Sequence, residues 1–230
     1  MEIAGLVKTS LIDFPGKITT VIFTQGCNFR CGFCHNPDLV PIKKGKISEG
    51  EVLTFLSGRR NKIEGVVITG GEPVIQKDLV SFLEKIKKMG FLIKLDTNGS
   101  KVKTLKELID KKLVDYVAMD VKGPLEKYPE IAKCLNTKSV QESIKLLKNS
   151  KIDHEFRTTV LPRLHQMDDF NKIGKLLQGA KLYTIQNFRP DVTLNLEFSS
   201  EKSFSPKELA AIAKIMRKNV KKIVIHSNIG

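Results

Sequence analysis

Residues 65–73 read Gly-Val-Val-Ile-Thr-Gly-Gly-Glu-Pro, a short apolar run that ends in two glycines and an acidic residue. An apolar run of this length, with β-branched residues in its middle, is typical of a strand that is covered on both faces. The glycines and the proline that follow indicate a turn out of the strand. The stretch therefore predicts a parallel strand whose carboxyl end carries polar groups, and other parts of the chain repeat this pattern.

Short β-branched runs recur along the chain. Further strands are predicted at residues 18–25, 91–98, 116–121, 154–161, 182–188 and 222–227. Amphipathic helices are predicted between them at residues 48–59, 76–89, 102–112, 139–148 and 168–177, with a last helix that opens at Ser205. Ser48 and Glu51 have the spacing of a capping box, and Gly90 is a natural left-handed stop for the second helix.

Strands that alternate with helices predict βαβ units, a parallel sheet and right-handed crossovers. About six such units are too few for a complete eight-stranded barrel. The pattern therefore favours an α/β fold of the open partial (β/α)6 barrel type, with parallel strands, over a flat doubly wound sheet. The sequence contains no linker-like stretch, no low-complexity segment and no internal repeat, so we expect residues 1–230 to form one domain.

Polar motifs follow the predicted strands at the points where the strands end. They are Thr24-Gln25-Gly26-Cys27, Gly70-Gly71-Glu72-Pro73, Asp96-Thr97-Asn98-Gly99 and Asp120-Val121-Lys122, and Arg157 and Gln186 lie on the next two strands. In parallel α/β folds the active site forms at the carboxyl edge of the sheet, because the loops there converge. The agreement of these strand ends predicts an active site at that edge.

Three of the four cysteines, Cys27, Cys31 and Cys34, lie within eight residues, and Cys134 stands alone. Such a cluster indicates metal binding or redox chemistry rather than a disulfide framework. Three thiolates on one short loop can bind three irons of a 4Fe–4S cube and leave the fourth iron open to an external molecule. A zinc site that adds His35 is the alternative, although no second pair of cysteines follows. For Cys134 we expect a buried free thiol.

The spacing C-x-x-x-C-x-aromatic-C, with Phe33 as the aromatic residue, is followed by Gly-Gly-Glu-Pro after the next strand. This combination resembles the radical S-adenosylmethionine (SAM) superfamily, and the resemblance covers nearly the whole chain. The stretches SLIDFPGK (10–17), CNFRCGFCHNP (27–37), DTNG (96–99) and DVK (120–122) are similar to the glycyl-radical-enzyme activating branch. Within that branch, the nearest likeness is to the activating proteins of anaerobic ribonucleoside-triphosphate reductase.

By position, the resemblance implies that Cys27, Cys31 and Cys34 ligate three irons and that SAM chelates the open iron. The residues implied to contact SAM are Phe33, Gly70, Gly71, Glu72, Asp96, Thr97, Asn98, Asp120, Lys122, Arg157 and Gln186. The Gly-Gly-Glu turn would receive the amino group of SAM, the aromatic residue would lie beside the adenine, and the lysine would pair with the carboxylate. In some members of the branch this corner holds a monovalent cation, for which the two aspartates are the candidates.

Each of these residues also has a purely structural interpretation. The pair Gly70-Gly71 fits an ordinary β-turn between a strand and a helix. Asp96 and Asp120 could be helix caps or solvated loop acids. Lys122 could be a surface charge, and Arg157 could be an ion-pair partner.

The resemblance implies that a reductant such as flavodoxin or ferredoxin passes one electron to the cluster, and that SAM is then cleaved to methionine and a 5′-deoxyadenosyl radical. That radical would remove a hydrogen from the Cα of a glycine in a partner enzyme, and anaerobic ribonucleotide reductase is the partner we expect. Two alternatives stay open. One is a radical SAM enzyme that acts on a small molecule, as in deazapurine biosynthesis, and the other is a zinc-binding module that contacts nucleic acid.

The chain is basic, with 39 Lys and Arg against 25 Asp and Glu and a net charge of +14. The positive residues are scattered over the predicted helices in mixtures with Glu, so a solvated lysine-rich surface is favoured over a nucleic-acid interface. No apolar run reaches the roughly 20 residues that a membrane span requires. The N-terminal stretch lacks the pattern of a secretory signal, and we therefore expect a cytoplasmic protein.

Overall fold

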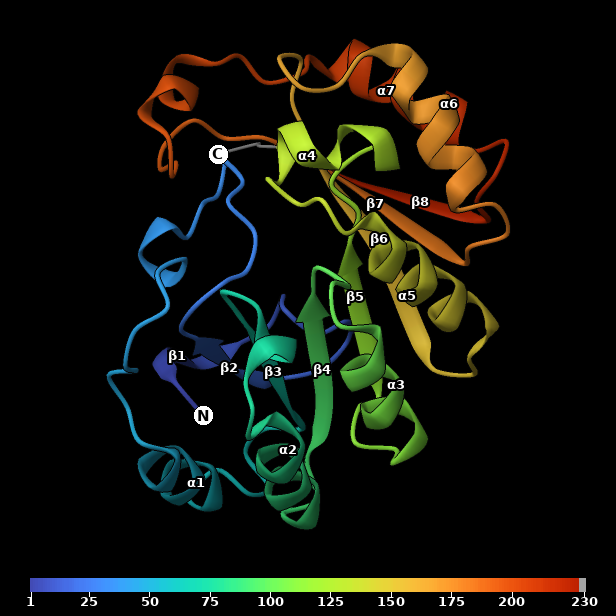
Figure 1. The fold of residues 1–230 in the computed structure, drawn as a ribbon. Helices are drawn as coiled ribbons and strands as arrows, with labels where there is room; N and C mark the ends of the chain where they lie inside the picture. The colour runs from blue at the N-terminus through green and yellow to red at the C-terminus, as the bar shows by residue number, and fades with distance from the viewer. Residues whose placement is uncertain (228–230) are drawn as a thin grey trace. The chain divides into compact units, whose positions relative to one another are not determined.

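The computed structural model describes residues 1–227, in which the chain forms two compact units. The first unit consists of Met1–Asn28 and Asp38–Ala118, and the second consists of Phe29–Pro37 and the chain from Met119 onward. The chain therefore passes from one unit to the other within the cysteine segment and again within strand β5 (Tyr116–Asp120). Each unit combines strands with helices (Figure 1).

In the first unit, the strands β2 (Thr19–Thr24), β3 (Gly65–Gly70) and β4 (Leu92–Thr97) run parallel and in consecutive order. Their bounds lie within one residue of the predicted ones. An additional strand, β1 (Ile3–Ser10), pairs antiparallel with β2 and was not predicted. Its apolar residues 3–7 include Ala4 and Gly5, which are depleted in strands, and most of its residues are half-buried or exposed.

The helices of the first unit are α1 (Glu49–Ser57), α2 (Leu79–Lys88) and α3 (Val102–Asp110). The predicted capping box is present, because the Ser48 hydroxyl accepts from the N–H of Glu51 and the Glu51 carboxylate accepts from the N–H of Ser48.

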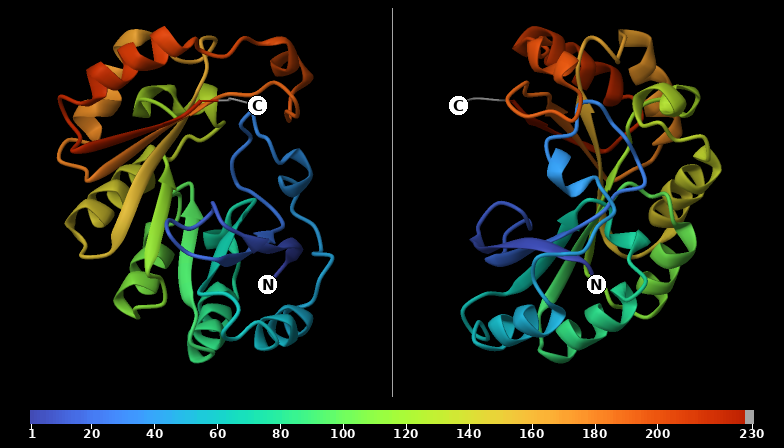
Figure 2. Two further views of the ribbon diagram at one scale, coloured as in Figure 1. Left: turned by 180° about the vertical axis from the view of Figure 1, so that it is seen from behind. Right: turned by 60° about the vertical axis from the view of Figure 1, so that its left-hand side comes forward.

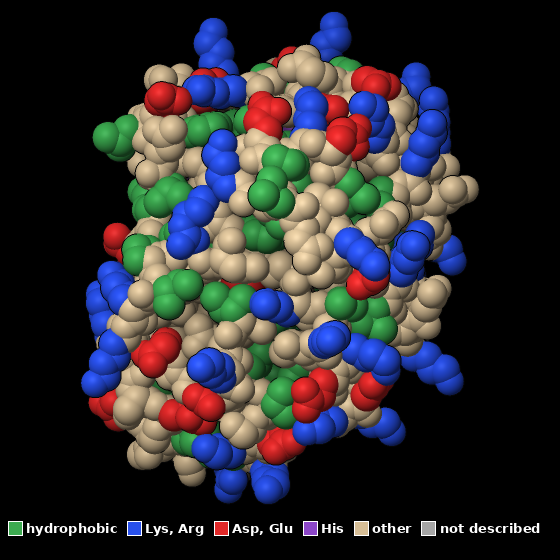
Figure 3. Space-filling model, in the orientation of Figure 1, with side chains coloured by type: hydrophobic (Ala, Val, Ile, Leu, Met, Phe, Trp, Pro, Cys, Tyr) green, Lys and Arg blue, Asp and Glu red, His purple; other side chains and the backbone are tan. Residues whose placement is uncertain are grey.

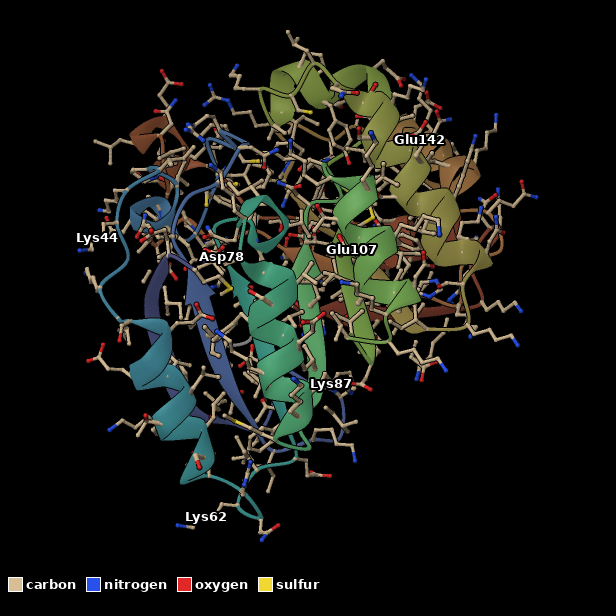
Figure 4. The ribbon with its side chains drawn as sticks, turned by 60° about the horizontal axis from the view of Figure 1, so that its bottom comes forward. Lys44, Lys62, Asp78, Lys87, Glu107 and Glu142 are labelled. Atoms are coloured by element: carbon tan, nitrogen blue, oxygen red, sulfur yellow. The ribbon has the colours of Figure 1, made fainter. Side chains whose placement is uncertain are left out.

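Helix α2 begins at Leu79, later than the predicted residue 76, and a separate 3-10 turn at Pro73–Ile75 lies between β3 and this helix. Asp78 and Lys87 lie at opposite ends of α2 (Figure 4), where their charges suit the helix dipole. Gly90 adopts the predicted left-handed conformation, with φ of 91°, and ends this helix.

One face of the strands in the first unit carries an apolar cluster. Its buried members are Phe14, Val21 and Val67, and partly buried Phe23, Leu92 and Tyr116 pack against them. Because side chains alternate along a strand, Lys94 and Asp96 share the face of Leu92. The apolar cluster therefore gives way to charged residues toward the carboxyl end of β4.

In the second unit, β6 (Asp153–Val160), β7 (Leu182–Asn187) and β8 (Lys222–His226) run parallel, and Figure 2 shows them side by side. The helices of this unit are α4 (Tyr128–Ile131), α5 (Thr137–Asn149), α6 (Met167–Leu176) and α7 (Pro206–Met216). Helices α6 and α7 pack against each other. The predicted start of the last helix is confirmed, because Ser205 and Glu208 form a capping box. Further 3-10 turns lie at Pro37–Leu39, Leu125–Lys127 and Leu196–Ser200.

The surface carries mixed charges. On the face drawn in Figure 3, Lys and Arg side chains are spread among Asp and Glu side chains rather than gathered in one place. This agrees with the predicted solvated lysine-rich surface. Among residues 1–227, every helix is too short or too polar to span a lipid bilayer.

Candidate functional site

The cysteine segment begins in the first unit, directly after β2. The backbone N–H of Gly26 donates to the carbonyl of Leu39 at 2.8 Å, and the N–H of Cys27 donates to the carbonyl of Val40 at 3.0 Å. The buried side chain of Gln25 spans the same loop, since its amide donates to the carbonyls of Asp38 and Pro41. These hydrogen bonds fix the backbone at Cys27.

The remaining cysteines of the motif lie in the second unit. Cys31 is buried and Cys34 is half-buried, and the N–H of Cys34 donates to the carbonyl of Cys31 at 3.1 Å in a tight turn. Burial raises the pKa of the Cys31 thiol to about 11, while the positive charge of Lys122 opposes that rise. All four cysteines of the chain lie in the described residues and none is in a disulfide.

An aromatic contact supports this turn from within the second unit. Phe33 is buried, and its ring centroid lies 6.2 Å from that of Phe198. The carbonyl of Gly32 accepts from the N–H of Asn195 at 2.9 Å, and a Cβ at Gly32 would come within 2.5 Å of the Phe198 ring. The turn between the last two cysteines of the motif is therefore packed onto the segment around residues 195–198.

In the first unit, the Gly-Gly-Glu turn after β3 is bonded to the segment that leads into the cysteines. The N–H of Gly71 donates to the carbonyl of Thr24 at 2.9 Å, and the N–H of Glu72 donates to the carbonyl of Gly26 at 2.8 Å. A Cβ at Gly71 would lie 2.1 Å from the Gly26 carbonyl oxygen, and one at Gly70 would lie 2.3 Å from the Thr24 nitrogen. Glycine is required here by the close approach of two backbones, so an ordinary β-turn does not account for this pair.

The carboxylate of Glu72 joins the ends of β3 and β4. It accepts from the Thr97 hydroxyl at 2.6 Å, from the Asn98 N–H at 2.6 Å and from the Val74 N–H at 3.3 Å. Glu72 is 1% exposed. The sequence predicted cofactor contact for Glu72, Thr97 and Asn98, and the structure brings all three together.

Asp96 lies at the carboxyl end of β4, and it is paired with a residue for which the sequence predicted no role. The ammonium of Lys94 contacts the Asp96 carboxylate at 2.5 Å. Asp96 is neither a helix cap nor a solvated loop acid, because it is within the strand and its side chain is 16% exposed.

In the second unit, Asp120, Lys122 and Arg157 form one charged group. The Asp120 carboxylate accepts from the Arg157 Nε at 2.8 Å and from the Lys122 Nζ at 3.0 Å. Burial alone would raise the pKa of Asp120, but the two positive charges hold it well below its usual range. Burial likewise would lower the pKa of Lys122, and the charge of Asp120 raises it instead. All three groups therefore stay ionised.

The backbone of Lys122 is held by two residues without any signal in the sequence. Its N–H donates to the Tyr128 hydroxyl at 3.0 Å, and its carbonyl lies 2.9 Å from Nε2 of His165. Because a carbonyl only accepts, Nε2 carries the proton, and Nδ1 accepts from the Leu161 N–H at 3.3 Å. Burial lowers the pKa of His165, in keeping with this neutral form.

Gln186 and Cys134 are the remaining residues that the sequence singled out, and both belong to the second unit. Gln186 is on β7, paired in register with Thr159 and His226. Cys134 is only partly buried, so the expectation of a buried thiol was wrong; it follows the short helix α4 in a loop. Within residues 1–227, no three His, Cys, Asp or Glu side chains are arranged to hold a metal ion, and the cysteine ligands stay a prediction.

Comparison with known proteins identifies the class to which this chain belongs. Residues 21–177 match the Radical SAM superfamily, and the chain is a member of it. It is 35% identical over 234 residues to a protein of Methanocaldococcus jannaschii with the name "Putative glycyl-radical enzyme activating enzyme", with 98% of this chain and 95% of that protein covered. It is 26% identical over 233 residues to the pyruvate formate-lyase-activating enzyme of Clostridium pasteurianum, with 96% and 95% covered.

Among solved structures, the chain is similar to Streptococcus suis SuiB bound to S-adenosylmethionine, with a TM-score of 0.71 and 14% identity. The match covers 90% of this chain and 50% of SuiB, so the chain spans about half the length of that protein. The predicted α/β class with parallel strands, of the radical SAM type, is thereby confirmed.

Membership of the superfamily implies a 4Fe–4S cluster and SAM, and features of the chain fit both. The thiol groups are the ligand type that such a cluster requires. The glycine pair packs against the backbone of Thr24 and Gly26, and the ionised ammonium of Lys122 is a group that can pair with the carboxylate of SAM.

Proposed function

We propose that this radical SAM enzyme is an activase that abstracts a hydrogen from a glycine of a partner enzyme, and that the partner is anaerobic ribonucleotide reductase. The observation that carries the proposal is the Gly-Gly-Glu turn bonded to the segment that enters the cysteine motif. The relatives named above as activating enzymes, which match nearly the whole chain, support the activase assignment. The proposal treats residues 1–230 as one radical SAM domain.

Within this proposal, Cys27, Cys31 and Cys34 ligate three irons, and the cluster and SAM, when bound, supply the 5′-deoxyadenosyl radical after reduction by flavodoxin or ferredoxin. The backbone carbonyls of Gly70 and Gly71 accept from the amino group of SAM, while the carboxylate of Glu72 fixes the position of this turn through Thr97 and Asn98. Phe33 supplies an apolar surface on the cysteine turn for the adenine.

The charged residues of the proposal act on the carboxylate of SAM. Lys122 supplies positive charge, and Asp120 and Arg157 orient it. Gln186 contacts SAM from β7, and Asp96 lies at the end of β4. A bound monovalent cation is not part of the proposal, because Lys94 and Arg157 already contact the carboxylates that would hold it.

The decisive experiment compares two cysteine variants of the anaerobically reconstituted protein. Cys31→Ala should reduce the iron and sulfide content and abolish cleavage of SAM to 5′-deoxyadenosine. Cys134→Ala is the matched control, because it removes a thiol outside the motif, and it should cleave SAM at the wild-type rate. Cleavage that survives in Cys31→Ala would contradict the assignment.

The partner is tested with the same material. Incubation with anaerobic ribonucleotide reductase, SAM and reductant should produce the doublet of a glycyl radical in the electron paramagnetic resonance spectrum. Cleavage of SAM without that doublet would favour another glycyl radical enzyme or the small-molecule alternative. A colourless protein with one zinc ion per chain would favour the zinc-binding alternative.

A further inference from the structure

Lys94 is a charged residue in the middle of a buried strand. Its neighbours in β4, Ile93 and Leu95, are fully buried, and Lys94 itself is 3% exposed. In the parallel register it lies level with Val67 of β3, a member of the apolar cluster. A lysine is almost never buried to this extent unless its ammonium is paired.

The partner of this ammonium is Asp96, two residues further along the same face of the strand. Nζ of Lys94 and Oδ1 of Asp96 are 2.5 Å apart. The next residue, Thr97, donates its hydroxyl to Glu72, which fixes the Gly-Gly-Glu turn. The buried ion pair is therefore adjacent in sequence to the bonded group at the ends of β3 and β4.

Stability is a poor explanation for such a pair. Buried ion pairs can often be replaced by apolar residues of similar volume without loss of stability, because removing two charges from water costs as much as their attraction returns. A methionine at position 94 would continue the surface of Val67 and Leu92. The charge at position 94 therefore points to a role at the carboxyl end of β4.

We propose that Lys94 is a positioning residue whose ammonium serves as a built-in monovalent cation for Asp96. It neutralises and orients the carboxylate beside the SAM site, so that SAM binding by this chain does not depend on a bound alkali cation. Because the ammonium is attached to the strand, it is present at Asp96 at any salt composition. This inference rests on the proposed function, which places Asp96 at the SAM site.

The experiment measures the dissociation constant of SAM for the anaerobically reconstituted protein by equilibrium dialysis, in buffers of equal ionic strength that contain potassium, ammonium or choline. Wild-type protein should bind SAM with the same affinity in all three. Lys94→Ala opens a space for a small cation, and it should bind SAM roughly tenfold more weakly in choline, the loss of about one charge-assisted contact. Potassium or ammonium should restore its binding.

Two further variants separate charge from structure. Lys94→Met fills the space without the charge, and it should bind SAM weakly in every buffer. Lys87→Ala removes the lysine of another ion pair in the first unit, in which Lys87, in the last turn of α2 (Figure 4), contacts Asp115 at 2.9 Å. The Asp115 carboxylate accepts from the N–H of Ile93, near the start of β4. The SAM affinity of Lys87→Ala should equal that of wild type in all three buffers.

The outcomes are distinct. Wild-type binding that requires potassium, or Lys94→Ala binding that equals wild type in choline, would overturn the inference. If Lys94→Ala binds SAM weakly and neither potassium nor ammonium restores the affinity, the role of Lys94 is structural, and the inference would also be overturned. If Lys94→Ala fails to fold, Lys94→Met decides, and wild-type affinity in that variant would defeat the inference. Failure of wild-type protein to bind SAM in any buffer would instead count against the proposed function.

Discussion

Two acidic residues at strand ends, one in each unit, are held in different ways. Glu72 follows β3 in the first unit, is almost fully buried, and accepts hydrogen bonds from a hydroxyl and from two backbone N–H groups. Asp120 ends β5 at the start of the second unit, has a side chain that is 28% exposed, and accepts from the cations Arg157 and Lys122.

The difference indicates two kinds of task. Neutral donors have strict directions, so the bonds to Glu72 fix the geometry of the backbone at the ends of β3 and β4. Cations act over longer distances, so the groups around Asp120 set the charge of their surroundings and respond to pH. We therefore expect substitutions around Glu72, the first group, to change stability through packing and hydrogen bonding. Substitutions around Asp120, the second group, should change stability through charge.

The largest effect should come from adding one methyl group to the backbone contact of the first unit. In Gly71→Ala, the Cβ would lie 2.1 Å from the Gly26 carbonyl oxygen and 2.8 Å from that of Leu39. Both are backbone atoms that cannot move aside, so we expect a loss of roughly 3 kcal/mol or more in the free energy of unfolding. Denaturation in urea measures this loss.

Gly5→Ala is the matched control, since a Cβ at Gly5 would meet no atom within 4 Å. Its free energy of unfolding should lie within about 0.5 kcal/mol of the wild-type value. Equal stability of the two variants would show that the turn after β3 yields easily, and the proposed rigid geometry of the first group would be wrong.

This contact shows how far the sequence predicts the site. The glycines, the acidic residues and their places after the strands were predicted, because apolar runs followed by turn residues have a clear pattern. The bonds of Gly71 and Glu72 to Thr24 and Gly26 join segments more than forty positions apart in sequence, which no local pattern reports. The close backbone approach was therefore visible only in the structure.

Some residues of the site were not predicted from the sequence, and they differ in how strong a sequence signal they carry. Lys94 interrupts an apolar strand two residues before Asp96, and strand alternation alone puts both side chains on one face, so a signal was present. His165 lies in a loop without periodicity, and its bond to the carbonyl of Lys122 depends on the tertiary fold. Strand β1 was not predicted because Ala4 and Gly5 interrupt its β-branched pattern.

A smaller effect is expected when the Glu72 carboxylate becomes an amide of the same size. In Glu72→Gln, one of the two oxygens is replaced by an NH2 group, which then faces the N–H of either Asn98 or Val74. Leaving a buried donor without an acceptor costs about 1–3 kcal/mol, and urea denaturation should show a loss of that size. Exposed Glu84→Gln is the control and should change stability by less than about 0.5 kcal/mol. If Glu72→Gln loses no more unfolding free energy than Glu84→Gln, hydrogen bonding does not distinguish the group around Glu72 from the group around Asp120.

The smallest loss of unfolding free energy is expected for a substitution of Asp120, and this loss should depend on pH. Asp120→Asn keeps the shape of the side chain but removes the negative charge between Arg157 and Lys122. We expect the free energy of unfolding to fall by roughly 1–2 kcal/mol at neutral pH. This loss is smaller than that for a fully buried ion pair, because Asp120 is partly exposed. The pKa of Asp120 is lower in the folded protein than the value of about 3.9 in an unfolded chain. The stability that the charge contributes is therefore complete above about pH 5 and is lost as the pH falls below about 4 toward the folded pKa.

The difference in unfolding free energy between wild type and Asp120→Asn should thus be constant at neutral pH. It should shrink in acid, because the unfolded wild-type chain then binds a proton at Asp120 that the folded protein does not bind. Urea denaturation at a series of pH values measures it. The same series with Asp110→Asn, which removes an exposed partner of Lys106, should show a difference near zero at every pH. A difference for Asp120→Asn that persists unchanged into acid would mean that the hydrogen bonds accepted by Asp120, and not its charge, hold this group, and the two strand ends would then work in the same way.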